Sequence, residues 1–259
     1  MTKLKIGLFG FGKTGRLVAN ELINHEDTEL VWVVKQNTLS EFSYASRALG
    51  INKDEGTIIY ASMLNAQFYS NNLVDIIIDF SNHKGVYEYL DAAIEHKIKI
   101  ISAISNYEES DLKALKTISN NSAVIHSPNI TLGVNLLMVA AKIFQNIIPN
   151  ADIEIIEEHF SGKIEVSGTA KRIANYLEIS EANNIKSIRA GGIVGKHEVI
   201  FGLASQTLRV IHESINRSSF GQGAIFAAQW IANTEQGFYT MEEIIIELFR
   251  TSVPANVNK

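Results

Sequence analysis

The chain has 259 residues, of which 46% are hydrophobic and 20% are charged, a composition typical of a globular protein with two domains or one large one. The formal net charge of -5 disfavours nucleic acid and anionic membranes as partners, because both repel an acidic protein. The absence of cysteine excludes disulfides, thiolate nucleophiles and cysteine-based zinc sites; it is compatible with a reducing compartment, and we expect a cytoplasmic protein. The apolar segment near the N-terminus is too short for a membrane span, so we expect no membrane partner.

Strands and helices alternate in the first half of the chain. Lys5 to Phe9 and Glu29 to Val34 are typical of buried strands, and the spacing of apolar residues predicts a helix over 14–24 between them. The other expected strands lie at 58–59, 74–78, 98–101 and 123–126, with helices over 87–95 and 109–118. This order predicts an α/β fold with a parallel sheet that is covered on both faces.

The pattern changes after about residue 130. The spacing predicts a long helix over 133–148, followed by strands and two more helices. The expected strands are 152–158, 188–194, 198–203 and 207–213, and the expected helices are 223–233 and 241–249. We therefore expect a first domain over 1–130, a second α+β domain with a mixed sheet over 131–214, and a C-terminal segment.

A glycine-rich turn follows the first predicted strand and opens the first predicted helix. Its sequence is Gly10-Phe11-Gly12-Lys13-Thr14-Gly15, a G-x-G-x-x-G pattern. The first glycine permits the tight turn, the second lets a pyrophosphate approach the backbone, and the third lets the helix pack on the strand. The motif in this context predicts dinucleotide binding, and a purely structural tight turn is the alternative.

Lys35 follows the second predicted strand, where an NAD-binding protein usually carries an acidic residue for the ribose. A lysine can pair with the 2′-phosphate of NADPH instead, and Lys13 in the turn could assist. The hypothesis is a preference for NADPH, with NADH still possible; the alternative is that Lys35 is a solvated surface lysine.

His159 and Lys163 stand four residues apart, just before a predicted helix that opens with Ser167-Gly168-Thr169. Histidine titrates near neutral pH, and lysine adds a positive charge and a transferable proton. A helix N-terminus offers N–H donors and a partial positive charge to a carboxylate. The combination predicts proton transfer beside a bound anionic substrate, whereas each residue alone would be an ordinary strand end, surface lysine or helix cap. The spacing of the seven histidines signals no metal site.

Several segments together carry a family resemblance that spans nearly the whole chain. These segments are Ile78-Asp79-Phe80-Ser81, 129–135, 157–170 and 189–198. They resemble the 4-hydroxy-tetrahydrodipicolinate reductase family, also called dihydrodipicolinate reductase, of the bacterial lysine pathway. Several ordered motifs are far more specific than any single one.

The resemblance implies a Rossmann domain formed by 1–130 and completed by 215–259, and a substrate-binding and tetramerisation domain over 131–214. It implies a homotetramer and hydride transfer from NAD(P)H to a cyclic conjugated imine dicarboxylate. His159 and Lys163 match the catalytic pair, with Lys163 as proton donor, and Gly168 and Thr169 match the positions that hold a substrate carboxylate. Ser167 and Phe160 are expected near the substrate. Further residues expected near the cofactor are Phe80, Ala103, Ser105, Asn129 and Arg217.

This sequence departs from the family pattern at a few positions. Phe160 replaces a second histidine, and the segment 103–106 replaces a G-T-T-G loop, so that Ile104 stands where a threonine would donate a hydrogen bond. Losing a charge-assisted hydrogen bond weakens binding of a dicarboxylate by roughly 1.5–3 kcal/mol. Two alternatives therefore stay open, namely a divergent paralogue that reduces a less anionic cyclic imine and a non-catalytic dinucleotide-binding sensor.

Overall fold

The computed structural model describes residues 2–36 and 40–252, which divide into two compact units. Unit 1 is formed by residues 2–130 and 218–241, and unit 2 by residues 131–217 and the described residues from 242 on. Each unit has its own sheet and its own hydrophobic core.

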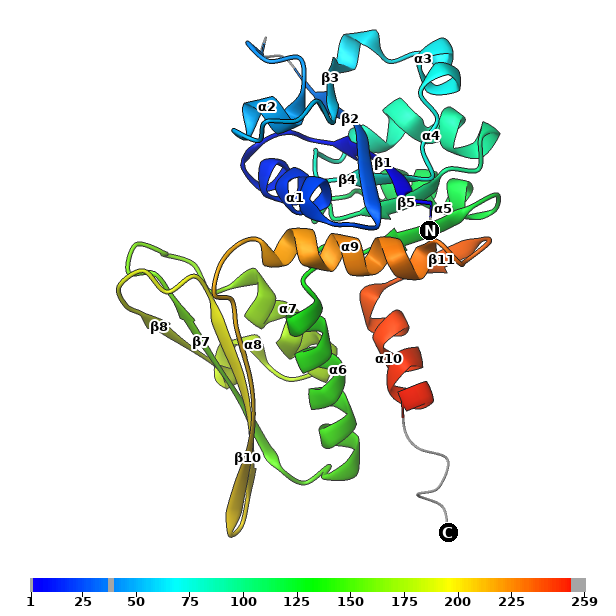
Figure 1. Cartoon of the computed structure of the whole chain (residues 1–259). Helices are drawn as coiled ribbons and strands as arrows, with labels where there is room; N and C mark the ends of the chain where they lie inside the picture. Colours follow the sequence, from blue (N-terminus) through cyan, green and yellow to red (C-terminus); the bar gives the residue numbers. More distant parts are fainter. Residues whose placement is uncertain (1, 37–39, 253–259) are drawn as a thin grey trace. The chain divides into compact units, whose positions relative to one another are not determined.

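Unit 1 contains a seven-stranded sheet whose strands all run parallel, in the order β11-β6-β5-β4-β1-β2-β3 (Figure 1). Its strands are β1 (Leu4–Phe9), β2 (Thr28–Lys35), β3 (Thr57–Tyr60), β4 (Ile76–Asp79), β5 (Lys99–Ser102), β6 (Ala123–His126) and β11 (Gly237–Tyr239). Its helices are α1 (Lys13–Asn24), α2 (Ala45–Ala48), the 3-10 helix η1 (Ala61–Met63), α3 (Ala66–Asn71), α4 (Gly85–Glu95), α5 (Glu109–Ser119) and α9 (Ser219–Ile231).

The central strands of unit 1 are apolar because they are buried on both faces. Ile76, Ile77 and Ile78 of β4 are all fully buried, as expected for a sheet with helices on either side. Helix α1 packs against α9, and α4 packs against α5. The expected doubly wound α/β fold of the Rossmann type is confirmed.

Unit 2 contains a four-stranded mixed sheet in the order β10-β9-β7-β8, in which β7 runs parallel to β8 and antiparallel to β9. Its elements are α6 (Leu132–Ile147), β7 (Asp152–His159), α7 (Gly168–Leu177), α8 (Glu181–Asn184), β8 (Ile185–Arg189), β9 (Lys196–Leu203), β10 (Gln206–Glu213) and α10 (Met241–Ser252). Helices α6 and α7 lie against one face of this sheet (Figure 1), and the core between them includes Ile155, Ile173 and Phe201. The expected α+β arrangement with a mixed sheet is confirmed.

One strand lies earlier than its pattern predicted. The expected strand over 188–194 is observed at Ile185–Arg189, and the chain then turns through 190–195 before β9 begins. Gly191 adopts a φ of +49°, and its carbonyl accepts a hydrogen bond from the Ser161 N–H at 3.1 Å. Two adjacent glycines allow this turn, so the apolar Ile193 and Val194 belong to a loop.

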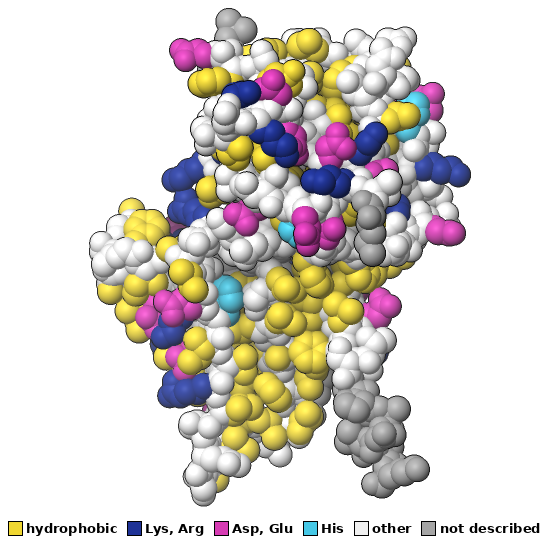
Figure 2. Space-filling view, viewed as in Figure 1, with side chains coloured by type: hydrophobic (Ala, Val, Ile, Leu, Met, Phe, Trp, Pro, Cys, Tyr) yellow, Lys and Arg dark blue, Asp and Glu magenta, His cyan; other side chains and the backbone are white. Residues whose placement is uncertain are grey.

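The C-terminal segment divides differently from the prediction that assigned all of 215–259 to the dinucleotide-binding domain. Residues 218–241 group with unit 1 and include α9 and β11, whereas α10 from Glu242 on groups with unit 2. The physical reason is the apolar surface of α6 and α7, since Ile246 and Phe249 share a groove with Val139 and Tyr176. Figure 2 shows hydrophobic side chains gathered on this part of unit 2.

Candidate active site

The three glycines of the turn between β1 and α1 meet three different environments. Gly10 has a φ of +91°, and a Cβ there would lie 2.6 Å from the Phe80 carbonyl oxygen. A Cβ on Gly15 would lie 1.7 Å from the Gly10 oxygen, so only glycine lets α1 begin this close to β1. Beside Gly12 a Cβ would meet no atom within 4 Å. The turn is therefore closely packed at its first and third glycines and open at the second, as phosphate binding at a helix N-terminus requires.

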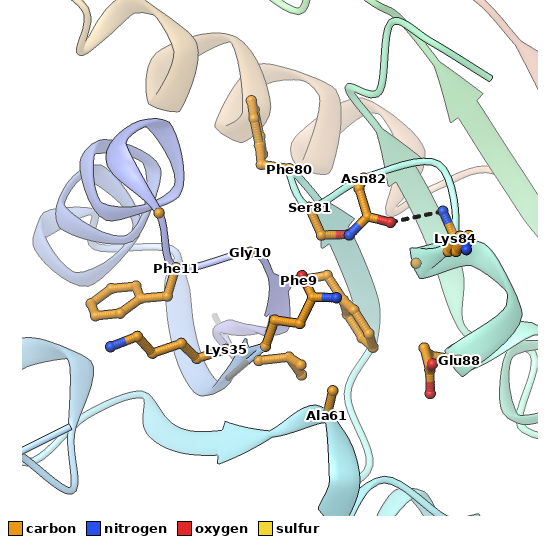
Figure 3. A pocket seen from close by; sticks show the side chains of 14 residues that line it. Phe9, Gly10, Phe11, Lys35, Ala61, Phe80, Ser81, Asn82, Lys84 and Glu88 are labelled. Atoms are coloured by element: carbon orange, nitrogen blue, oxygen red, sulfur yellow. Dashed lines mark hydrogen bonds between the residues drawn. The ribbon is translucent and has the colours of Figure 1, made fainter. Parts of the chain in front are cut away.

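A cavity of about 410 Å³ opens at the carboxyl ends of β1, β2 and β4 (Figure 3). In the strand order β1 lies between β2 and β4, so β2 and β3 are added on one side of β1 and the later strands on the other side. Ligands of open parallel sheets bind at such a point. The side chains that line it include Phe11, Lys35, Phe80, Ser81, Asn82 and Glu88. The Arg16 guanidinium lies 5.1 Å from the centre of the Phe11 ring and donates to the Ala48 carbonyl at 2.5 Å.

A second cavity of about 240 Å³ shares Phe80 and Ser81 with the first. Its lining comprises Thr14, Phe80, Ser81, Ala103, Ile104, Ser105, Asn106, Pro128, Ile130 and Phe220. Two hydrogen bonds fix the loop after β5. His126 Nε2 lies 3.0 Å from the Ile104 carbonyl oxygen, and Ser102 Oγ lies 2.7 Å from the Tyr107 hydroxyl. The two cavities thus bring the expected residues Thr14, Phe80, Ala103 and Ser105 together.

The remaining expected cofactor residues do not line these cavities. Lys13 is the first residue of α1 and is exposed. Asn129 is half-buried after β6, and its carbonyl accepts from Ser127 Oγ at 2.7 Å. Arg217 is exposed and groups with unit 2.

A buried carboxylate shapes the turn that both cavities share. Asp79 is fully buried at the end of β4 and accepts hydrogen bonds from the Ser81 N–H at 2.8 Å, from Ser81 Oγ at 2.6 Å and from the Tyr89 hydroxyl at 3.0 Å. Burial raises the pKa of Asp79 to about 6, although these hydrogen bonds act in the opposite direction. The carboxylate therefore orients Phe80 and Ser81 toward the cavities.

His159 is the last residue of β7 in unit 2, and its ring orientation follows from one carboxylate. Its Nδ1 lies 2.5 Å from Glu157 Oε2, and because a carboxylate only accepts, Nδ1 carries the proton. Nε2 is then left as the atom that can exchange a proton. A Cβ on Gly195 would lie 3.1 Å from Nε2, so the glycine keeps the space beside this atom free.

Glu157 has no exposed surface, and both of its carboxylate oxygens are hydrogen-bonded. Arg189 pairs with both of its oxygens, and Ser187 Oγ donates to Oε1 at 2.5 Å. Burial alone would raise the pKa of Glu157, but the hydrogen bonds, first from Arg189 and then from Ser187, lower it to about 2. Glu157 is therefore an anion at neutral pH.

Lys163 lies in the loop that joins β7 to α7 and is partly exposed. Its N–H donates to the Phe160 carbonyl at 3.1 Å, which closes a turn, and its own carbonyl accepts from Arg189 Nε at 2.8 Å. The Phe160 side chain is 42% exposed.

Helix α7 begins at the expected Ser-Gly-Thr sequence. Ser167 is the N-cap, and its Oγ accepts from the Ala170 N–H at 3.4 Å. A Cβ on Gly168 would meet no atom within 4 Å, so the first turn of the helix has free space beside it. The start of α7 therefore has open space where a helix N-terminus can bind an anion.

Three residues around His159 were not among the expected site residues. Glu157 orients the ring, Arg189 holds Glu157, and His197 lies with its ring centre 5.4 Å from that of His159 and its Nε2 2.9 Å from Ser167 Oγ. The sequence already favours an orienting role for Glu157, since side chains two apart on a strand point to the same face. Arg189 and His197 come from other strands, and no local pattern indicates them.

Within residues 2–36 and 40–252, no group of three or more His, Asp or Glu side chains could hold a metal ion. No helix in the same described ranges is both long and apolar enough to cross a membrane.

Comparisons with known proteins cover both units. A family model described as dihydrodipicolinate reductase, N-terminus, matches residues 4–130, and one described as dihydrodipicolinate reductase, C-terminus, matches residues 133–245. The 4-hydroxy-tetrahydrodipicolinate reductase of Buchnera aphidicola subsp. Schizaphis graminum is 29% identical over 92% of this chain and 95% of that protein. Its counterpart from Buchnera aphidicola subsp. Baizongia pistaciae is 31% identical over 94% of this chain and 98% of that protein.

The fold is also similar to solved structures. A dipicolinate-bound dihydrodipicolinate reductase from Paenisporosarcina sp. TG-14 aligns with a TM-score of 0.77 at 22% identity, covering 94% of this chain and 100% of that chain. The two family models together span most of the sequence. The chain therefore belongs to the dihydrodipicolinate reductase family, whose members are pyridine-nucleotide-dependent oxidoreductases of lysine and diaminopimelate biosynthesis.

Proposed function

We propose that this protein reduces 4-hydroxy-tetrahydrodipicolinate to tetrahydrodipicolinate with NAD(P)H and a proton, and that the 4-hydroxyl group leaves as water. The observation that carries the proposal is the Glu157–His159 contact of 2.5 Å, in a unit that also contains Lys163 and the open start of α7. Relatives that bear the name of this activity match over nearly the full length of both chains. No observation favours a different substrate.

The residues of unit 1 fit a dinucleotide. Gly12 leaves open space beside the backbone where a pyrophosphate would lie, and the N-terminus of α1 would provide N–H donors to it. The first cavity would hold the adenosine part, and Phe80, Ala103 and Ser105 would lie beside the nicotinamide. Nicotinamide in its reduced form supplies a hydride to the substrate.

NADPH is the cofactor that we propose over NADH. Lys35 lines the first cavity at the end of β2, where the ribose of the adenosine is expected, and a lysine there favours a 2′-phosphate. The described residues at the end of β2, Lys35 and Gln36, include no acidic residue that would repel the 2′-phosphate.

Unit 2 would bind the substrate and supply the proton. The N–H groups of Gly168 and Thr169 would hold one carboxylate at the start of α7, and the Lys163 ammonium would attract the dicarboxylate and donate a proton to its carbon or nitrogen framework. Glu157 keeps the proton of His159 on Nδ1, so Nε2 would relay or orient the proton of Lys163. Phe160 would give the pocket an apolar edge in place of a second histidine.

We further propose a homotetramer, whose stoichiometry is an inference from the family. The sheet face of unit 2 opposite α6 and α7 supports self-association. Ile211 is 54% exposed and Ile188 is 44% exposed on this face. The charged side chains beside them are paired, as in Lys196–Glu158 at 2.7 Å and Arg209–Glu198, so the face carries few unpaired charges that an interface would have to desolvate.

The function is tested by following the absorbance of reduced nicotinamide with freshly generated 4-hydroxy-tetrahydrodipicolinate. We expect turnover, a higher kcat/KM with NADPH than with NADH, and a fall in kcat of about 10²- to 10⁴-fold in His159→Gln and Lys163→Gln. The Kd for NADPH should not change in these variants, and Lys142→Gln, which removes a partly exposed lysine of α6, is the matched control. No turnover by the wild-type protein would reject the proposed substrate, and a preference for NADH would reject the proposed cofactor.

A further inference from the structure

The Arg189 side chain joins two parts of unit 2 that lie far apart in the sequence. Its Nη1 and Nη2 donate to Oε2 and Oε1 of Glu157 at 2.9 and 2.5 Å. Its Nε donates to the Lys163 carbonyl at 2.8 Å, and Nη2 also donates to the Glu165 carbonyl at 2.9 Å. The guanidinium is thus shared between the strand that carries His159 and the loop that carries Lys163.

The partner of Arg189 extends the connection to the start of α7. Glu157 accepts from the Ser167 N–H at 3.3 Å through the same Oε1 that Arg189 contacts, and its Oε2 holds His159 Nδ1. Glu157 has no exposed surface, and the Arg189 side chain is 19% exposed. The Arg189–Glu157 ion pair therefore contacts His159 on β7, the loop that carries Lys163, and Ser167 at the start of α7.

We propose that Arg189 is a positioning residue for the reduction, which holds the Lys163 loop directly and the His159 ring through Glu157. This role rests on the proposed function, because it assumes that His159 and Lys163 supply the proton. Arg189 itself donates into the protein through Nε, Nη1 and Nη2, so its task is to set the geometry of the other two residues.

The chemistry of arginine explains why this residue type stands here. A guanidinium presents five N–H donors in a rigid plane and can bind a carboxylate through two nitrogens while Nε points elsewhere. An ammonium is a single nitrogen and cannot reach the Glu157 oxygens and the Lys163 carbonyl at the same time. Lysine at this position would keep the positive charge beside Glu157 and release the loop.

The test is Arg189→Lys, with Arg172→Lys as the matched control. Arg172 makes a comparable pair in the same unit, donating to Glu242 Oε1 at 3.2 and 2.6 Å, and it touches neither Glu157 nor the Lys163 loop. We expect kcat of Arg189→Lys to fall about tenfold to a hundredfold, because a misplacement of about 1 Å in a reacting group has this effect. The Kd for NADPH should stay at the wild-type value in both variants.

A second measurement needs no substrate. The N–H groups of Ser161 and Lys163 are bonded to the Gly191 and Phe160 carbonyls, so their hydrogen exchange reports on the order of the loop. Exchange at both should quicken by about tenfold in Arg189→Lys and stay unchanged in Arg172→Lys.

The His159 ring gives a third readout, the NMR signal of its Nδ1–H in the substrate-free protein, because Nδ1 lies 2.5 Å from Glu157 Oε2. Around the ring lie Glu157 on β7, Arg189 on β8, which holds Glu157, and His197 on β9. Glu157→Gln replaces the carboxylate that accepts from Nδ1–H, so this signal should shift, and it should also shift in Arg189→Lys because the carboxylate loses its fixed orientation.

The outcomes separate the two proposals. A wild-type protein that does not turn over rejects the proposed function, and hydrogen exchange and the His159 Nδ1–H signal then decide on Arg189 by themselves. The positioning role is overturned if Arg189→Lys leaves both the hydrogen exchange of Ser161 and Lys163 and the NMR signal of His159 at their wild-type values. A fall in kcat with wild-type exchange also overturns it, because Arg189 would then act on the bound substrate directly.

Discussion

At the scale of single residues, the glycine-rich turn has the most specific demands. Gly10, Gly12 and Gly15 all look alike in the motif, yet the structure gives them different tasks, since two make room for neighbouring backbone and one leaves room for a ligand. The sequence motif predicted the tight turn at Gly10 and the close packing at Gly15, which the structure confirms, whereas the approach of a pyrophosphate at Gly12 stays a prediction. It could do so because the roles depend on a local strand–turn–helix geometry that the motif itself encodes.

This difference leads to a prediction for Gly15→Ala and Gly12→Ala. The new methyl group in Gly15→Ala would meet the Gly10 carbonyl, and relieving that clash should lower the free energy of unfolding by about 2 kcal/mol. Gly12→Ala should keep wild-type stability, because its φ of -85° suits alanine and nothing lies within 4 Å, but it should bind NADPH more weakly. Urea unfolding and fluorescence titration with NADPH measure the two effects. Equal losses of stability would contradict this assignment.

At the scale of elements, β9 and the start of α7 depend on a buried neutral histidine. His197 is 4% exposed, its Nε2 contacts the N-cap Ser167, and its Nδ1 has no hydrogen-bond partner among the described residues. Burial lowers the pKa of His197 to about 4, with His159 and His212 acting in the same direction. His197 therefore binds a proton less readily in the native state than in the unfolded chain.

The sign of the resulting pH dependence is fixed by this lowered pKa. As the pH falls from about 6.5 to about 4, the unfolded state binds a proton that the native state excludes, so stability decreases by about 3 kcal/mol through this group. His197→Gln should flatten that part of the stability curve. Chemical denaturation at a series of pH values gives the curves. A variant with the wild-type slope would show that His197 does not titrate in this range.

At the scale of the whole molecule, the face of the unit 2 sheet opposite α6 and α7 is the surface through which we expect the protein to self-associate. Ile156, Ile188, Ile200 and Ile211 alternate along their strands with residues of the core, so they point away from α6 and α7. A row of isoleucines among paired charges is typical of a surface that is buried by association.

If the proposed homotetramer forms through this face, Ile211→Glu should weaken it without unfolding the protomer. A carboxylate in the centre of an apolar interface must lose its hydration, whereas on a free surface it costs little. Leu73→Glu in unit 1 is the control, since Leu73 is 51% exposed and Ile211 54%. Sedimentation velocity reports the assembly state. An Ile211→Glu protein that still sediments as the wild-type assembly would exclude this face as the interface.

The sequence by itself determined the α/β class, the parallel strands of unit 1, the glycine turn and the segment with His159, Lys163 and Ser167. Each of these depends on residues that are close in the chain, where periodicity and motif spacing carry the information. The turn at 190–195 was missed because apolar Ile193 and Val194 resemble a strand, and the two glycines before them act through a backbone conformation.

Only the tertiary structure decided what surrounds His159 and where α10 belongs. Arg189 lies 32 residues from Glu157 in the chain, and Ser167 lies 30 residues from His197, so their contacts depend on strand register and helix packing. The pattern of α10 predicts a helix but does not identify the surface that covers it; the apolar groove beside α6 and α7 does so. Local sequence specifies an element, whereas its partners are selected by burial and hydrogen bonding across the whole fold.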